Sequence, residues 1–257
     1  MWYTQVRGGD AGRRRAGAPA GGAAVRKGAA MGTCRILSRS TQPFRDRLEA
    51  ARLLAQELSN DLEGEVVVLG IPRGGVLLAR ELADRLGAAL DVVLVRKLGA
   101  PGNPELAIGA VTEDGRVVMH EAVAGSLGAD RDYVQRETQR QYAVLCERKE
   151  AYRGVSPRVP LEGRTAVVTD DGVATGATLL AALWAVRDEA PDRLIAAVPV
   201  GPEGNLRRLA QDADELICLR APPGFAAVGQ FYVRFEQVSD RQVIQALRER
   251  PGSARQQ

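Results

Sequence analysis

Short runs of consecutive apolar residues, separated by segments of helical spacing, constrain the fold of this chain more than any other feature. The runs are EVVVLG at 65–70, ALDVVLV at 89–95, TAVVT at 165–169, RLIAAVPV at 193–200 and ELICL at 215–219. A strand that is apolar on both faces needs cover on both faces, as in a parallel sheet between two layers of helices. The sequence therefore predicts an α/β fold with a central, mostly parallel sheet flanked by helices on both faces.

Helices are expected between these strands, because apolar residues recur there near every third or fourth position. The expected helices are at 45–58, at 75–87, from about Ala177, around Asn205–Gln211 and, as a long segment, at 129–153. The last segment lacks glycine and proline and is densely charged, which is typical of a largely exposed helix.

The segment LGAPGNPE at 98–105 is rich in glycine and proline, and we expect it to be an irregular, mobile loop. The two apolar stretches that follow it, LAIGAV and RVVMH, predict two strands joined around Glu113, Asp114 and Gly115. This part of the chain breaks the alternation of parallel strands and helices.

The two ends of the chain differ in composition from the rest. Residues 1–30 are half alanine and glycine and carry six of the 35 basic residues, which leaves 29 basic and 31 acidic residues after them. We expect a disordered extension over 1–40, one domain over 41–250 and a disordered tail over 251–257. The mildly acidic domain indicates no nucleic-acid partner. No run approaches the roughly 20 apolar residues of a membrane span, so the expected location is the cytoplasm.

Cysteine and histidine usage argues against a protein metal site or a disulfide framework. The three cysteines, Cys34, Cys146 and Cys218, are scattered without the spacing of metal ligands, and His120 is the only histidine. His120 follows an expected strand and is interpreted as a surface residue.

Two adjacent carboxylates, Asp170 and Asp171, end the apolar run TAVVT and precede a loop of small residues that opens a helix. Ligands of such folds bind at the carboxyl ends of the strands. A pair of carboxylates can accept hydrogen bonds from a vicinal diol, and a helix N-terminus attracts phosphate. Thr175 and Thr178 add hydroxyl groups, and Gly176 permits close backbone approach. The pattern predicts a site for a ribose 5-phosphate group.

The stretch VVTDDGVATGAT resembles the motif that binds 5-phosphoribosyl-1-pyrophosphate (PRPP) in type I phosphoribosyltransferases. The resemblance covers most of 44–245, and the segments RKLGAPGNPELAIGAV and FAAVGQFY are similar to a bacterial subgroup of that family. It implies a Rossmann-like type I fold with a small hood subdomain, and Mg²⁺ as the cofactor. It assigns substrate binding to Arg73, Gly74, Arg96, Lys97, Asp170, Asp171, Gly172, Val173, Ala174, Thr175, Gly176, Ala177 and Thr178.

Two further stretches resemble parts of the family's site. GIPRGGV at 70–76 resembles the pyrophosphate loop, in which the resemblance implies a cis peptide bond between Arg73 and Gly74; the alternative is an ordinary tight turn. VRKLGAPGNPE places Arg96 and Lys97 where the family has basic residues beside a loop that closes over the reaction centre. Glu105 is open between capping a strand and contacting substrate.

Aromatic residues gather in 221–240, which is the candidate hood: Phe225, Phe231, Tyr232 and Phe235. One ring there could stack on a nucleobase, and a role in the core or in a dimer contact is the alternative. Ala174 occupies the position at which hypoxanthine-guanine enzymes of the family carry an aspartate that acts as general base. An alanine at this position has no group that can accept a proton. Gly172 replaces a usual apolar residue.

The resemblance implies a transferase of nucleotide salvage that moves ribose 5-phosphate from PRPP to a small nitrogen acceptor, with a nucleobase as the expected class, and acts as a homodimer. Arg73, Lys97, Asp170 and Asp171 are the expected catalytic residues, with the two aspartates holding Mg²⁺ through water and PRPP. A PRPP-sensing regulatory protein is the alternative of another class. A hydrolase or phosphorylase of ribose 5-phosphate compounds is the third interpretation.

Overall fold

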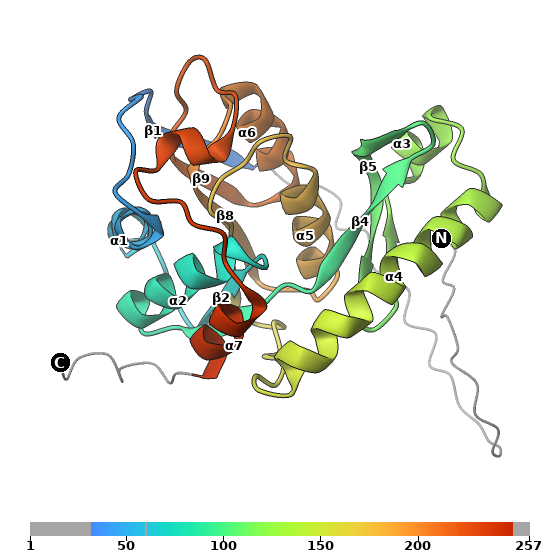
Figure 1. The fold of residues 1–257 in the computed structure, drawn as a ribbon, viewed down its shortest axis with the longest axis horizontal. Helices are drawn as coiled ribbons and strands as arrows, with labels where there is room; N and C mark the ends of the chain where they lie inside the picture. Colours follow the sequence, from blue (N-terminus) through green and yellow to red (C-terminus); the bar gives the residue numbers. More distant parts are fainter. Residues whose placement is uncertain (1–31, 60, 249–257) are drawn as a thin grey trace.

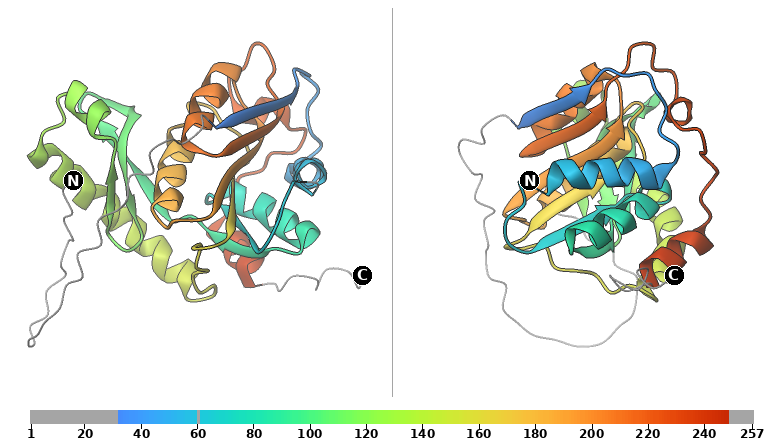
Figure 2. Two further views of the ribbon diagram at one scale, coloured as in Figure 1. Left: turned by 180° about the vertical axis from the view of Figure 1, so that it is seen from behind. Right: turned by 90° about the vertical axis from the view of Figure 1, so that its left-hand side faces the viewer.

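A parallel sheet of six strands forms the centre of the protein in the computed structural model, which describes residues 32–59 and 61–248 (Figures 1 and 2). Its strand order is β1-β9-β8-β7-β2-β3, and every neighbouring pair is parallel. The strands are β1 (Thr33–Ser38), β2 (Val66–Gly70), β3 (Ala89–Val92), β7 (Thr165–Thr169), β8 (Arg193–Val200) and β9 (Glu215–Arg220). The predicted central sheet is confirmed.

Helices cover both faces of this sheet, as the apolar runs require. They are α1 (Arg47–Leu58), α2 (Gly74–Leu86), α5 (Ala177–Arg187) and α6 (Glu203–Leu209), while α7 (Asp240–Arg248) packs against α2 and α4. Leu54 of α1 and Leu78 of α2 are buried in one apolar cluster, and Leu183 of α5 and Leu206 of α6 in another. Because alternate residues of β2, β7, β8 and β9 enter the two clusters, these inner strands are buried on both sides.

A second, antiparallel sheet stands beside the first and carries the long helix (Figure 1). It consists of β4 (Val95–Ala100), β5 (Asn103–Thr112) and β6 (Val117–Met119), followed by α3 (Glu121–Ser126) and α4 (Arg131–Arg153). The predicted pair of strands around Glu113–Gly115 and the predicted long helix are confirmed. The expected strand at 89–95 is divided, because the chain leaves the large sheet after Val92 and enters the small one at Val95.

The expectation of an irregular loop at 98–105 is wrong, because this segment forms the β4–β5 hairpin. Gly102 takes the positive φ of 73° that the turn requires. A Cβ atom on Gly99 would lie 2.8 Å from Cα of Pro104, so glycine allows the two strands to approach where their register shifts. Glycine and proline here shape a bulged hairpin and do not interrupt it.

The structured part of the chain begins earlier than the expected boundary after residue 40. Residues Thr33–Ser38 form β1 at the edge of the large sheet, with Cys34 opposite Leu216. Arg35 interrupts the apolar pattern of this short strand, which is why the pattern did not reveal it. Its guanidinium is held by Asp61 and, at 3.1 Å, by Glu215. Residues 1–31 and the expected tail at 251–257 lie outside the described residues.

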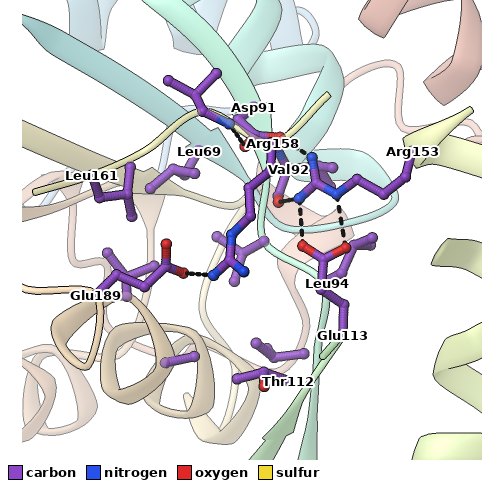
Figure 3. A pocket seen from close by; sticks show the side chains of 15 residues that line it. Leu69, Asp91, Val92, Leu94, Thr112, Glu113, Arg153, Arg158, Leu161 and Glu189 are labelled. Carbon is purple, nitrogen blue, oxygen red and sulfur yellow. Dashed lines mark hydrogen bonds and ion pairs between the residues drawn. The ribbon is translucent and has the colours of Figure 1, made fainter. Parts of the chain in front are cut away.

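One arginine joins the two sheets. Arg153, the last residue of α4, places both arms of its guanidinium on Glu113 at 2.7 Å and one arm on Asp91 at 2.6 Å (Figure 3). It also donates to the carbonyl oxygen of Val92 at 3.1 Å. Asp91 lies on β3 and Glu113 follows β5, so a single, largely buried side chain fixes the small sheet against the edge of the large one.

Among the residues that the structure describes, no helix is both long and apolar enough to span a bilayer.

Candidate functional site

The carboxyl ends of β2 and β7 lie side by side, with Gly70 opposite Thr169 in the parallel register. The loop after β2 carries GIPRGGV, and the loop after β7 carries the acidic pair. Neighbouring parallel strands present their following loops at the same edge of the sheet. Two stretches that are about a hundred residues apart in the sequence therefore meet at one place.

The contact between these two loops is closer than any side chain would allow. A Cβ atom on Gly74 would lie 1.9 Å from Oδ2 of Asp171, and one on Gly75 would lie 2.9 Å from Cα of Asp170. Gly74 and Gly75 form the first turn of α2, so the positive end of this helix abuts the two carboxylates. The structure thus brings Gly74, Asp170 and Asp171 together.

The cis peptide bond is one residue earlier than expected. It joins Pro72 to Arg73, and the predicted position between Arg73 and Gly74 is wrong. The carbonyl oxygen of Arg73 already accepts a hydrogen bond from the N–H of Val76 at 3.2 Å, so the bond after Arg73 belongs to the first turn of α2. The chain therefore changes direction between β2 and α2 before the bond that joins Arg73 to Gly74.

Burial governs the charge of the acidic pair. It raises the pKa of Asp170 well above its usual range, and repulsion from Asp171 raises it further. Burial also raises the pKa of Asp171, although the guanidinium of Arg47 opposes that shift. Oδ1 of Asp170 accepts from the N–H of Asp171 at 2.8 Å, and Asp170 has no ion pair within residues 32–59 and 61–248. The pair is poised to accept hydrogen bonds or a cation.

Arg47 is a site residue that sequence reasoning missed. Its Nε and Nη2 atoms both lie 2.8 Å from Oδ2 of Asp171, and its Nη1 donates to the carbonyl oxygen of Glu236 at 3.0 Å. The guanidinium carbon is 4.0 Å from the centroid of the Phe235 ring. Arg47 opens α1, far from every recognised motif, so only the packing of α1 on the sheet could reveal its role.

Side chains of α6 donate hydrogen bonds to the backbone of the small-residue loop that follows the acidic pair. Asn205 donates to the carbonyl oxygen of Ala174 at 2.6 Å, and Arg208 to that of Thr175 at 2.9 Å. Gly176 has a φ of 82° and caps α5, while Thr178 is exposed in the first turn of the helix. The N–H of Ala177 donates to Oγ1 of Thr175 at 3.4 Å. The other N–H groups of the first turn have no acceptor within the helix, as an anion site requires.

A cleft of about 270 Å³ lies between this edge of the sheet and α4. Pro72, Arg96, Lys97 and Thr178 line it together with α4 residues, so three of the predicted site segments border one space. Lys97 pairs with Glu105 at 3.0 Å, and Nε of Arg96 donates to Gln141 at 3.0 Å. Glu105 lies within β5 and borders the same cleft, and its contact with substrate stays a prediction.

Arg73 lies apart from the residues that line this cleft. Its Nη1 is 3.8 Å from Oδ2 of Asp240, at the start of α7, and Asp240 also accepts a hydrogen bond from the hydroxyl of Tyr152. The side chain is therefore directed toward α7, while the backbone of its loop faces the site.

The aromatic residues of the candidate hood pack on one another and on the core. Phe231 and Tyr232 are buried, and the ring centroids of Tyr232 and Phe235 are 4.9 Å apart. The hydroxyl of Tyr232 donates to the carbonyl oxygen of Asp171 at 2.6 Å. A Cβ atom on Gly172 would lie 2.5 Å from Cγ1 of Val228, so glycine at this position lets the hood segment pack onto the acidic loop. The core role is confirmed for the two buried rings.

The described part of the chain contains no cluster of three or more histidine, cysteine, aspartate or glutamate side chains that could hold a metal ion. Asp170 and Asp171 provide two carboxylates, of which Asp171 is paired with Arg47. This donor set fits a divalent cation that takes most of its ligands from substrate oxygens and water, and does not fit a site built from protein ligands alone.

Replacing Asp170 with asparagine is expected to raise the free energy of unfolding at neutral pH by roughly 0.5–2 kcal/mol. Because the folded pKa of Asp170 lies above the value of about 4 in an unfolded chain, its ionised form opposes folding at higher pH. That opposition fades as the pH falls through the raised pKa, so the advantage of Asp170→Asn should shrink on acidification. Urea unfolding at several pH values checks this; an advantage that grows on acidification contradicts it.

Comparisons with a family model, with curated proteins and with solved structures agree on one family. A family model of the phosphoribosyl transferase domain matches residues 45–235. Two Mycobacterium tuberculosis proteins, from strains CDC 1551 and H37Rv, are named as candidate phosphoribosyl transferases; each is 46% identical over 204 residues, which are 79% of this chain and 46% of the relative. The chain thus spans about half the length of the curated relatives it matches. The crystal structure of TT1426 from Thermus thermophilus has a TM-score of 0.77 and 49% identity, and the match covers 80% of this chain and 98% of that one.

Proposed function

We propose, from the premise that this chain belongs to the phosphoribosyl transferase family, that it transfers ribose 5-phosphate from PRPP to a nitrogen of a small acceptor and releases pyrophosphate. The meeting of the two loops at Gly74, Asp170 and Asp171 carries the proposal. It places a half-buried pair of carboxylates between two helix N-termini, as a molecule with a diol between two phosphate groups requires.

The acidic pair would bind the ribose. Asp170 and Asp171 would accept hydrogen bonds from the two ribose hydroxyl groups, and Arg47 orients Asp171 and favours its ionised form. The loop from Gly172 to Thr178 then receives the 5-phosphate on the N–H groups and hydroxyls at the start of α5. Gly172, Val173, Ala174, Gly176 and Ala177 would contribute through their backbone.

The leaving pyrophosphate would lie in the cleft beside β4. As the bond from the anomeric carbon to pyrophosphate breaks, negative charge grows on the departing oxygen. Arg96 and Lys97 face that space and would stabilise this charge more in the transition state than in the bound donor. Because the side chain of Arg73 points toward Asp240, the loop before α2 would contribute to this site through its backbone.

Mg²⁺ bound to PRPP would supply charge neutralisation for the pyrophosphate oxygens. Asp170 and Asp171 would hold it through water, in keeping with their incomplete set of partners. The protein side chains would position the donor and exclude water around it.

The acceptor would bring its own nucleophilic lone pair, because Ala174 has no acid–base group. A nucleobase is the acceptor class that we propose, with a place in nucleotide salvage. A homodimer in the cytoplasm is the form of the protein that we propose.

Calorimetric titration with PRPP and Mg²⁺ tests the proposal. Wild-type protein should bind PRPP, and Asp171→Asn should weaken binding by roughly 10- to 100-fold, because it removes a charged hydrogen-bond acceptor. Asp132→Asn, at an exposed position of α4, is the matched control and should leave binding unchanged. A screen for pyrophosphate release over free bases then identifies the acceptor. Binding without release for any base would indicate a PRPP sensor, and no binding would refute the donor site.

A further inference from the structure

The cleft beside β4 has a second wall, formed by α4, that none of the recognised motifs includes. Arg140 and Arg148 of this helix line the cleft opposite Pro72, Arg96 and Lys97. Its volume of about 270 Å³ is close to the lower end of the roughly 300–1,000 Å³ range of small-ligand pockets.

The cleft holds more positive than negative charge. Lys97 is paired with Glu105, and both arms of Arg140 are held by Glu137 at 2.8 Å. Arg96 and Arg148, in contrast, have no ion pair with a carboxylate of the described residues. Two guanidinium groups are therefore left for an anion that enters from solvent.

A chain of hydrogen bonds fixes one of these two groups. Glu137 accepts from Gln141 at 2.8 Å, and Gln141 accepts from Nε of Arg96 at 3.0 Å. Burial lowers the pKa of Arg96, and the charges of Arg148 and Arg140 lower it further. The guanidinium groups therefore repel one another, and an anion between them would relieve that repulsion.

The position of Arg148 on α4 is not that of a solvated surface residue. Gln141 and Leu145 are buried on the face of the helix that contacts β4, and Arg148 follows them at the helical spacing of three to four residues. Arg136 is exposed and does not border the cleft. Arg148 thus lies on the face of α4 that borders the cleft, and Arg136 lies on its solvent face.

We propose that α4 forms part of the pyrophosphate site and that Arg148 contacts the pyrophosphate group directly. This inference rests on the proposed function, because it assigns the leaving group of PRPP to this cleft. Pyrophosphate carries several negative charges and suits a site with two uncompensated guanidinium groups. Arg148 would add to Arg96 and Lys97 in stabilising the charge that develops as the group departs.

Titration of the full chain with inorganic pyrophosphate and Mg²⁺ tests the role of Arg148. Arg148→Gln should weaken pyrophosphate binding roughly tenfold or more, as the loss of a charge-assisted hydrogen bond does. Arg136→Gln removes the same charge from the same helix outside the cleft and should change affinity less than about twofold. Equal affinities of the two variants would overturn the inference.

A second measurement uses the wild-type protein and does not depend on the folding of a variant. Phenylglyoxal modification, mapped by mass spectrometry, should be slowed by pyrophosphate at Arg148 and left unchanged at Arg136. Absence of protection at Arg148 would overturn the inference.

Parallel titration with PRPP separates the two proposals. If wild-type protein binds PRPP and pyrophosphate while Arg148→Gln behaves as Arg136→Gln does, only the role of α4 fails. If wild-type protein binds neither ligand, the proposed function fails and the role of α4 fails with it.

Discussion

Replacing Arg153 with alanine is expected to lower the free energy of unfolding by about 3–5 kcal/mol, as the loss of one partner from a buried ion pair does. The side chain of Arg153 is 15% exposed, and those of its partners Asp91 and Glu113 are 2% and 9% exposed. Its removal leaves two buried carboxylates and the carbonyl oxygen of Val92 without this donor. Several buried acceptors would thus lose a partner at once.

The pKa of Asp91 supports this expectation. Burial raises it even though Arg153 and the N–H groups of Val159 and Val92 all act to lower it. Without Arg153, the carboxylate would lose the largest of these opposing influences. The expected result of the substitution is therefore a loss of stability at neutral pH that partly recovers as Asp91 takes up a proton.

Chemical denaturation of Arg153→Ala and Arg187→Ala checks this prediction. Arg187 forms a two-armed ion pair with Asp214 at 3.0 Å, but both side chains are more than 40% exposed. An exposed pair contributes about 0–1 kcal/mol, so Arg187→Ala should be nearly neutral. Similar losses for the two variants would show that the buried network does not hold the two sheets together.

Replacing Gly75 with alanine is expected to cost about 1–3 kcal/mol of stability and to abolish most PRPP binding. A Cβ atom at this position would lie 2.8 Å from the carbonyl oxygen of Thr169 and 2.9 Å from Cα of Asp170. Both atoms are backbone, so α2 or the end of β7 has to move. Such a shift displaces Asp170 and Asp171 from the N-terminus of α2.

Gly204→Ala is the matched control for this substitution. Gly204 lies in the first turn of α6, and a Cβ atom there would meet nothing within 4 Å. Alanine in an open helical position should leave PRPP binding unchanged and stabilise the protein by up to about 1 kcal/mol. Thermal unfolding and calorimetry of both variants measure the difference. A Gly75→Ala protein with wild-type affinity would mean that the loops need not touch.

The sequence was sufficient for the inner strands of the large sheet, because β2, β7, β8 and β9 are buried on both faces and therefore consist mostly of apolar residues. Short apolar runs such as TAVVT and ELICL, each lying between two helical segments, predict buried strands. The acidic pair and the small-residue loop were recognisable because all of their residues lie next to one another in the sequence.

The features that sequence reasoning missed depend on contacts between distant residues. Glycine and proline at 98–105 favour a loop in isolation, and only the partner strand makes that segment a hairpin. Arg47 acts on Asp171 across 124 positions of sequence, and no local pattern marks it. The direction of Arg73 toward α7 depends on Asp240, which a short helix after the hood brings near.

The charge in the middle of β1 has a consequence for how copies of this chain can associate. Within the described residues β1 pairs with β9 alone, so its other edge is open to a further strand. Arg35 occupies the centre of that strand, and its ion pairs with Glu57, Asp61 and Glu215 would have to be disturbed for another chain to add there. Charged side chains on edge strands are a common protection against such aggregation. Two molecules are therefore not expected to associate by adding a strand at β1.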